Sequence, residues 1–563
     1  MKRRLQEILT QRFVSCQELP MQPYKGAWQE WSWLLVLWII VTSYNIFKPY
    51  HMDDTAYLEI ACWITMHPLH PMSGPLNWWG VEEPIYKINQ PHLYFYVLAL
   101  WGKIFGFGEP AMHALQSLAS LACIVLFYRL AIMLCASAAV WVTTMLVLGP
   151  AFIVEQNLMV DVPLLAVWLV FFNLLICDAR DERQTRRYGI AAIACSAAIL
   201  IKYSSLVLLV ILCVSLLIER RKAQAWTIVV PLSAIAAWSL FNFIDYGGIH
   251  IATRPHGSGH FRLGAMAAWV LAVGALTPLG VIAAVQWVRI SSRAGNWVYL
   301  VVGAAFALLI VVVAFAVVSD LTSDRILLWV LRGNGGLIYL ALLLGGIALL
   351  VRRRLWLTDV ARQEAPFIYL FLWIAGTSVF YVLLAPFIAA RHVLLILPAI
   401  TLFLVGGWRH SLSRGSKVFG LVLTVVLSTG LCVSDWRFAD FYRSEVIALK
   451  RSLPPGSTVW VSGHWGWQWY ATKAGFQEVD VQASVLQPGD YLVVAEDVDY
   501  QSLARRPESL RLIRRDVQGD PWLNIFCTGR NGRFYQSTAS VAPWSLSLNC
   551  INHVTIFKAG AEK

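Results

Sequence analysis

Long apolar runs alternate with short polar or basic loops over most of this chain. The runs recur from Trp33 to Leu431, and each is continuously apolar rather than alternating in polarity. About 20 helical residues cross a hydrocarbon core of about 30 Å, and most of the runs are long enough to do so. Only helices or closed barrels satisfy all backbone polar groups inside lipid, and continuous runs indicate helices. The pattern predicts an α-helical polytopic membrane protein.

We expect about thirteen transmembrane helices, although the pairs within 188–218 and 366–407 could each be divided differently. The expected spans are 32–47, 112–134, 137–153, 158–177, 188–201, 203–218, 226–244, 266–287, 297–318, 335–351, 366–385, 391–407 and 417–434. Residues 1–31 then form a basic, amphipathic N-terminus. Residues 32–434 form a membrane domain whose first outer loop is 48–111.

Basic residues are concentrated in alternate loops, such as 180–187, 220–222 and 352–362. Cytoplasmic loops of membrane proteins carry an excess of Lys and Arg. The asymmetry predicts a cytoplasmic N-terminus, and it places the loop 48–111 outside together with everything after about residue 435. The protein is expected in the plasma (inner) membrane, with its site and its C-terminal domain extracytoplasmic.

Composition agrees with this class of protein. Hydrophobic residues make up 58% of the 563 positions and charged residues only 14%, whereas about a quarter of the residues in a soluble domain are charged. The net charge of +12 comes largely from the basic loops. It therefore orients the helices, and we expect no nucleic-acid partner.

The C-terminal residues 435–563 have the composition of a separate extracytoplasmic α/β domain. Strand-like runs bounded by Pro-Gly turns occur at 458–462, 491–495 and 553–557. This length suffices for a small domain with its own core. For the aromatic stretch 463–470 we favour a helix that packs the domain onto the membrane surface.

Two acidic residues, Asp53 and Asp54, directly follow the first span. Adjacent carboxylates near lipid are costly unless they are hydrated, paired or bound to a cation. A functional site and a solvated cap of a short helix explain them equally well.

Other acids and bases lie at the same face, at Glu155, Asp161, Lys202 and Arg391. A carboxylate at the N-terminus of a helix also favours the helix dipole, so each residue alone has a structural explanation. Together they place opposite charges at one membrane face, as binding of an anionic lipid headgroup requires.

The order and side of these motifs resemble the GT-C superfamily of lipid-linked-sugar glycosyltransferases. The nearest branch holds the protein O-mannosyltransferases and the lipid A aminoarabinose transferase. The similar segments are Asp53-Asp54, Tyr57-Leu58-Glu59, Gln90-Pro91-His92-Leu93-Tyr94, Asp161-Val162-Pro163-Leu164, Ile201-Lys202-Tyr203 and Arg391-His392-Val393-Leu394-Leu395. Gln90 stands where that branch carries lysine, so Lys87 is the candidate replacement.

The resemblance implies an enzyme that moves a sugar from a polyprenyl-phosphate donor to a hydroxyl of an envelope acceptor, with inversion. That acceptor could be lipid A, a glycan or an exported protein, and membrane lipids surround the enzyme. The implied general base is Asp53 or Asp54, and the implied donor-phosphate ligands are Lys87, Lys202 and Arg391. Asp161 and Glu155 would orient the acceptor or hold a metal. Hard oxygen ligands favour Mg²⁺ or Mn²⁺, but the sequence requires no cofactor.

Two other functions remain open at this point. A transporter or flippase of lipid-linked glycans would bind the same headgroups without transfer chemistry. It would be expected to carry charged or broken helices at mid-membrane, and few charges fall within the apolar runs. A non-catalytic scaffold would leave the acidic pair without purpose.

Cys527 and Cys550 both lie in the polar C-terminal region, and we expect them to form a disulfide in an oxidising compartment. Non-reducing mass spectrometry of protein from native membranes should find the linked peptides. Both thiols free in that experiment would contradict the pairing.

Overall fold

The computed structural model describes residues 27–560 except for twelve short segments. The segments left out are 79, 89, 177–183, 255–261, 293–322, 353–363, 408–411, 499–500, 504–509, 518–525, 529–532 and 547–551. The expected span 297–318 and Cys550 therefore lie outside the described residues.

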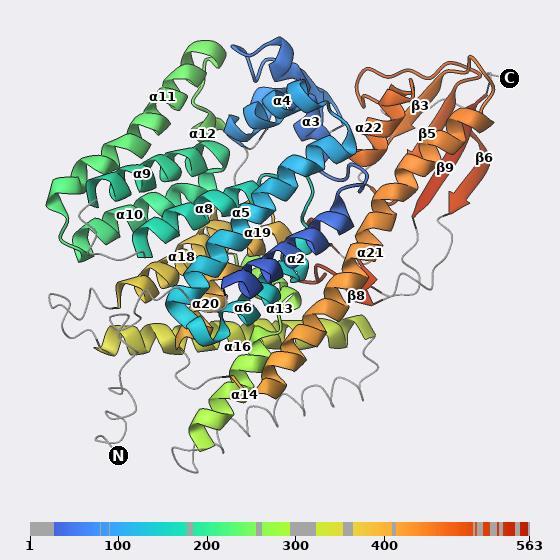
Figure 1. The fold of residues 1–563 in the computed structure, drawn as a ribbon. Helices are drawn as coiled ribbons and strands as arrows, with labels where there is room; N and C mark the ends of the chain where they lie inside the picture. Colours follow the sequence, from blue (N-terminus) through green and yellow to red (C-terminus); the bar gives the residue numbers. More distant parts are fainter. Residues whose placement is uncertain are drawn as a thin grey trace.

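Helices form most of the described chain (Figure 1). The longer ones are α2 (Ala27–Asn45), α5 (Glu109–Cys135), α8 (Asp161–Ile176), α9 (Gln184–Ile201), α11 (Val229–Tyr246), α16 (Ser323–Arg352), α18 (Ala365–Leu383) and α21 (Arg414–Ser452). The shorter ones are α3 (Asp54–Met66), α4 (Leu93–Phe105), α6 (Ala139–Val147), α7 (Pro150–Ile153), α10 (Leu206–Ile218), α12 (His250–Thr253), α13 (Leu263–Leu276), α14 (Leu279–Ser292), α19 (Ala390–Leu394), α20 (Leu397–Gly407) and α22 (Gly466–Lys473). Four 3₁₀ turns connect them, namely η2 (Ile85–Lys87), η3 (Ala136–Ala138), η4 (Tyr203–Ser205) and η5 (Lys222–Ile228).

Several of these helices suit a membrane. Six helical stretches of the described chain are long and apolar enough to cross one, and α13 with α14 makes a seventh if that pair, bent by 80°, crosses together. The prediction of a mostly helical membrane protein is confirmed. The count of about thirteen spans stays a prediction, because α8 and α10 are shorter apolar helices and one expected span is not described.

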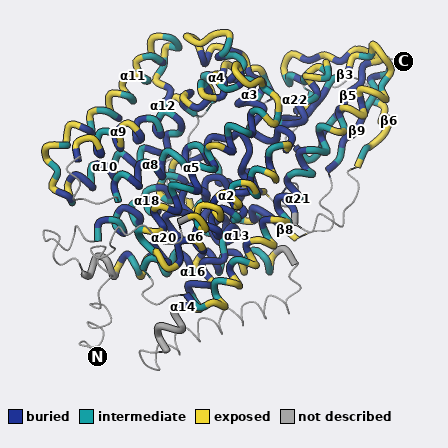
Figure 2. The backbone as a smooth tube through the Cα atoms, in the orientation of Figure 1, coloured by how far each residue is buried: buried dark blue, intermediate teal, exposed yellow. Residues whose placement is uncertain are grey.

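The pattern of burial also fits lipid around the outer helices. Figure 2 shows buried backbone at the centre and exposed backbone along α11. Leu240, Phe243 and Ile244 of α11 expose 59 to 75% of their surface. Large apolar side chains exposed together on one helix are typical of a lipid-facing surface.

The helices α13 and α16 touch at backbone level. A Cβ at Gly335 would collide with the carbonyl oxygen of Val270, and a Cβ at Gly274 would collide with that of Leu331. Small residues at helix interfaces allow such close approach in membranes, where packing rather than hydrophobicity drives association.

The C-terminal residues contain a five-stranded sheet beside the upper end of the long helix α21 (Figure 1). Its strand order is β4-β3-β5-β9-β6. The strands are β3 (Val459–Ser462), β4 (Gln477–Glu478), β5 (Tyr491–Ala495), β6 (Leu510–Val517) and β9 (His553–Ala559). β3 pairs in parallel with β4 and β5, whereas β9 pairs antiparallel with β5 and β6. Two small antiparallel pairs complete the strands, β1 (Pro75–Asn77) with β2 (Glu82–Pro84) and β7 (Phe526–Cys527) with β8 (Ser545–Leu546).

The aromatic stretch 463–470 packs inside the protein rather than presenting its tryptophans to a membrane surface. Trp467 is fully buried, and a Cβ at Gly466 would lie 2.5 Å from the carbonyl oxygen of Tyr50. The Tyr470 hydroxyl donates to Glu109 Oε1 at 2.5 Å and accepts from the Tyr50 amide at 2.8 Å. The helix α22 therefore joins the sheet to the first outer loop.

Replacing Gly335 by Ala should destabilise the protein by about 1–3 kcal/mol, because the added methyl forces α13 and α16 apart. Gly336→Ala is the matched control, since a Cβ there meets no atom within 4 Å. Thermal unfolding in lipid nanodiscs compares the two variants. Equal melting temperatures would show that the helices do not touch in this way.

Candidate functional site

Asp54 begins α3 and is fully buried. Its Oδ2 accepts from the His51 amide at 3.0 Å, and its Oδ1 accepts from the Leu158 amide at 2.7 Å. Burial raises the pKa of this carboxyl to about 7. Both oxygens thus hold backbone groups, and Asp54 links the first outer loop to the loop before α8.

Asp53 has a different partner and belongs to a row of alternating charges. The Arg391 Nη2 lies 2.7 Å from Asp53 Oδ2, and the Arg391 Nε lies 3.8 Å from Asp161 Oδ2. Lys202 Nζ lies 2.7 Å from Asp161 Oδ1. Asp53 is the N-cap residue of α3 but makes no side-chain cap hydrogen bond. The solvated helix cap considered above therefore does not explain the acidic pair.

These four residues come from four separate elements. Asp53 precedes α3, Asp161 opens α8, Lys202 follows α9 and Arg391 lies in α19. The side chains of Arg391 and Asp161 are 5% and 2% exposed, whereas that of Asp53 is 19% exposed. The row is therefore largely shielded from solvent, and Asp53 is its most accessible residue.

A cavity of about 40 Å³ lies beside the row. Lys202, Arg254 and Arg391 all line it, together with Gln90 and the ring of Tyr381. Three cationic side chains around one small cavity form a site for an anion, and guanidinium groups bind phosphate through paired hydrogen bonds. Arg254 is a phosphate-ligand candidate that the sequence analysis missed. Its only sequence signal is a basic residue in an outer loop.

Glu155 lies in the loop between α7 and α8 and is 1% exposed. In the described part of the chain, neither of its carboxylate oxygens has a hydrogen-bond partner. Burial raises the pKa of this carboxyl well above its ordinary value, although the positive charge of Arg391 opposes the shift. A buried acid with two unsatisfied oxygens is ready to bind a hydroxyl group or a proton.

Two predicted residues lie apart from this cluster in the contacts that the structure describes. Lys87 is 56% exposed and pairs with Glu83 at 2.5 Å, so no contact joins it to the charge row. Cys527 is buried in β7, and its partner Cys550 is not among the described residues. The disulfide and the phosphate role of Lys87 stay predictions.

A second buried network was missed in the sequence. Lys48 Nζ donates to Asp435 Oδ2 at 2.5 Å and to Asn157 Oδ1 at 2.6 Å. The Tyr535 hydroxyl donates to Asp435 Oδ2 at 2.8 Å and accepts from Asn157 Nδ2 at 2.9 Å. Lys48 and Asp435 each directly follow an apolar run, and that signal could have identified them. Nothing in the sequence marks Tyr535.

The charge row does not suit a divalent cation. Asp161 already faces Lys202 and Arg391, and Asp53 faces Arg391, so a metal would lie against two cations. Across the described residues, no group of three or more His, Cys, Asp or Glu side chains converges as metal ligands do. We therefore derive no step through Mg²⁺ or Mn²⁺.

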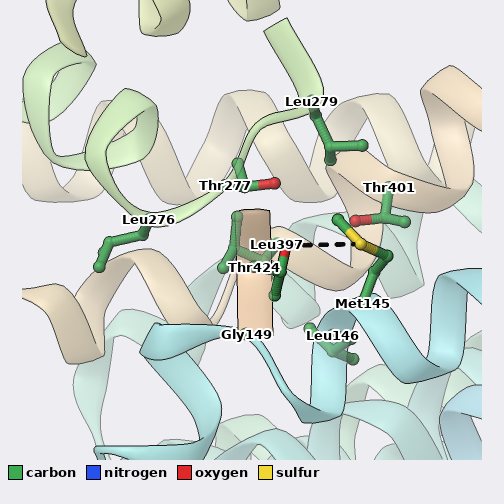
Figure 3. A pocket seen from close by; sticks show the side chains of 9 residues that line it. All are labelled: Met145, Leu146, Gly149, Leu276, Thr277, Leu279, Leu397, Thr401 and Thr424. Carbon is green, nitrogen blue, oxygen red and sulfur yellow. Dashed lines mark hydrogen bonds between the residues drawn. The ribbon is translucent and has the colours of Figure 1, made fainter. Parts of the chain in front are cut away.

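A different cavity, of about 10 Å³, lies at the break between α13 and α14 (Figure 3). Its lining is mainly apolar, and its one marked contact joins the Thr424 hydroxyl to the Met145 sulfur at 3.4 Å. No charged side chain lines it. The chemistry of the site therefore belongs to the charge row.

Residues 89–244 match the family model described as dolichyl-phosphate-mannose-protein mannosyltransferase. The matched segment contains Glu155, Asp161 and Lys202. The resemblance to GT-C glycosyltransferases predicted above is confirmed by this match. Fold and site together define a multi-pass, mostly helical membrane protein similar to that superfamily.

The chain also aligns with solved structures of ArnT and of an archaeal oligosaccharyltransferase. ArnT from Cupriavidus metallidurans bound to undecaprenyl phosphate is 15% identical, with a TM-score of 0.40 over 84% of this chain and 94% of that chain. The apo oligosaccharyltransferase of Archaeoglobus fulgidus is 10% identical, with a TM-score of 0.45 over 81% of this chain and 65% of that chain. These TM-scores are below 0.5, so functional inference rests on the family match and the site. No curated protein sequence matches the chain significantly.

Glu155→Gln should change how stability depends on pH. A raised pKa means that the folded state holds the proton more tightly, so wild type loses stability as pH rises from the ordinary value of 4.5 toward the folded pKa. The neutral amide carries no such dependence. The melting temperatures of both proteins are measured in nanodiscs at pH 5 and pH 8. Relative to wild type, the variant should be more stable at pH 8 than it is at pH 5.

Glu83→Gln, at the exposed pair with Lys87, is the control for the general effect of losing one carboxylate. A difference between Glu155→Gln and wild type that is equal at both pH values would contradict the buried, protonated acid.

Proposed function

We propose that this protein transfers a sugar from a polyprenyl-phosphate donor to a hydroxyl of an envelope acceptor. The observation that carries the proposal is the alternating row of Asp53, Arg391, Asp161 and Lys202 beside a cavity lined by three cations. Sugar transfer requires both a base for the acceptor and cations for the departing phosphate. The row brings these two requirements within contact distance.

Asp53 is the general base in this proposal. It is the most exposed acid of the row, and its carboxylate lies 2.7 Å from the guanidinium of Arg391. Asp54 is less suited to that role, because both of its oxygens already accept backbone hydrogen bonds. We assign Asp54 to positioning its neighbour.

The reaction is a single displacement. The acceptor oxygen forms a bond to the anomeric carbon, and its proton passes to Asp53. The bond from that carbon to the phosphate oxygen breaks, and the phosphate leaves with the electron pair. Lys202, Arg254 and Arg391 line the cavity that would receive this anion. Attack from the side opposite the phosphate inverts the anomeric centre.

Glu155 and Asp161 serve the acceptor side in this proposal. Neither oxygen of the Glu155 carboxyl has a hydrogen-bond partner among the described residues, so both can bind hydroxyl groups of an acceptor. The acceptor is a lipid, a glycan or an exported protein. The reaction takes place on the extracytoplasmic face of the inner membrane, as the distribution of basic loops indicates.

Asp53→Asn should lower transfer by about 10²–10⁴-fold, because it removes the general base. Purified protein in lipid receives a pool of polyprenyl-phosphate sugars and a membrane-lipid extract, and free polyprenyl phosphate is quantified. Asp245→Asn is the matched control, since that residue pairs with His70 in the outer region and not with the charge row. Bound donor with no release by wild type would favour the transporter alternative.

The same preparation distinguishes the two lysine candidates. Lys202→Gln should weaken binding of polyprenyl phosphate by roughly 10-fold or more, as loss of a charge-assisted hydrogen bond does. Lys87→Gln should leave binding near the wild-type value if the phosphate occupies the cavity. The reverse result would give the phosphate to Lys87, as the sequence alone suggested.

A further inference from the structure

The C-terminal residues 533–546, here called the tail segment, reach back into the membrane domain. The Ala390 amide donates to the carbonyl oxygen of Phe534 at 2.9 Å. The Ser537 amide donates to the carbonyl oxygen of Ile388 at 2.6 Å, and these two residues form an isolated antiparallel bridge. The tail segment therefore pairs by its backbone with the stretch that leads into α19.

That stretch carries Arg391. The residues before Ala390 are not helical, and Ala389 has an extended backbone with φ of −138°. Because α19 has only five residues, its own hydrogen bonds fix it weakly. Pairing with the tail segment adds a backbone restraint directly before Arg391, beside the packing of α19 against α7, α8 and α13.

Asp53, the acidic partner of Arg391, is also connected to the tail segment, through Tyr535. Tyr535 lies between the two paired tail residues and is 8% exposed. Its hydroxyl accepts from Asn157 Nδ2 at 2.9 Å and donates to Asp435 Oδ2 at 2.8 Å. Asn157 is also held by Lys48, at 2.6 Å.

Asn157 transmits this restraint to the acidic pair. The next residue, Leu158, donates its amide to Asp54 Oδ1 at 2.7 Å. Asp54 is the covalent neighbour of Asp53, which pairs with Arg391. One four-residue stretch, 534–537, thus restrains both sides of the Asp53–Arg391 pair, by its backbone on one side and by Tyr535 on the other.

We propose that Tyr535 is a positioning residue for the transfer reaction and that the tail segment holds the backbone next to Arg391 in place. The inference rests on the proposed function, because the group being positioned is the proposed base. It assigns to the C-terminal region an indirect part in catalysis, through the position of the proposed base. A sheet that merely decorated a complete membrane enzyme would not have this role.

Tyr535→Phe removes one hydroxyl and keeps the ring. We expect kcat to fall by roughly 10- to 100-fold, since small misplacements of a catalytic group have effects of that size. The KM for the donor should stay within about twofold, because Lys202 and Arg254 keep their places around the cavity. Tyr491→Phe is the matched control, as that tyrosine is also buried in the C-terminal region but lies in β5.

A double-mutant cycle separates positioning from general destabilisation. Asn157→Ala breaks the same connection from its other end, so the double variant should be no slower than the slower single variant. Additive losses, or a kcat for Tyr535→Phe within twofold of wild type, would overturn the proposal. An equal loss in Tyr491→Phe would also overturn it.

Hydrogen exchange provides a readout that needs no activity. The peptide covering 154–160, which holds Asn157 and the Leu158 amide bonded to Asp54, should exchange faster in Tyr535→Phe than in wild type or in Tyr491→Phe. If wild type transfers no sugar, the proposed function fails, and unchanged exchange would still overturn the restraint by the tail. If wild type is active and Asp53→Asn is not, normal kinetics of Tyr535→Phe would overturn this inference alone.

Discussion

The arrangement depends on the pairing of charges that are almost removed from water. Arg391 and Asp161 are 4% and 1% exposed, and an isolated charge in such a place would be strongly unfavourable. Each acid of the row lies against a cation, so the helices that carry these residues can meet only where the charges match. The ion pairs therefore select one packing of the helices more than they add to its stability.

The second buried network, around Lys48 and Asp435, also requires buried charges to match. Lys48 follows α2 and Asp435 lies in α21, and both are buried. Tyr535 completes this pair from the C-terminal region. The two networks meet through the loop 154–160, where Glu155 remains without a hydrogen-bond partner among the described residues. The two networks therefore hold the residues around Glu155 in place, and the Glu155 carboxyl can still form hydrogen bonds with a bound group.

Much of the architecture follows from local sequence. Apolar runs predict helices without knowledge of the partners, because backbone hydrogen bonds must be satisfied wherever lipid surrounds the chain. Asp53, Asp161, Lys202 and Arg391 stand out for a similar reason, as charges at the ends of apolar runs. Lys87 became a candidate only through the family resemblance, and the structure pairs it with Glu83 in an exposed position. Charge at a helix end identifies candidates and does not rank them.

The class of protein could therefore be inferred from the chain alone, since it depends on hydrophobicity summed over many residues. Tertiary structure alone decided which charges pair. Arg391 reaches Asp53 only because segments far apart in sequence pack together. Tyr535 contacts Asp435 in the same way, and the residues around Tyr535 in the sequence do not predict that contact. Long-range contacts depend on the shape and complementarity of whole surfaces, and a local pattern carries no record of them.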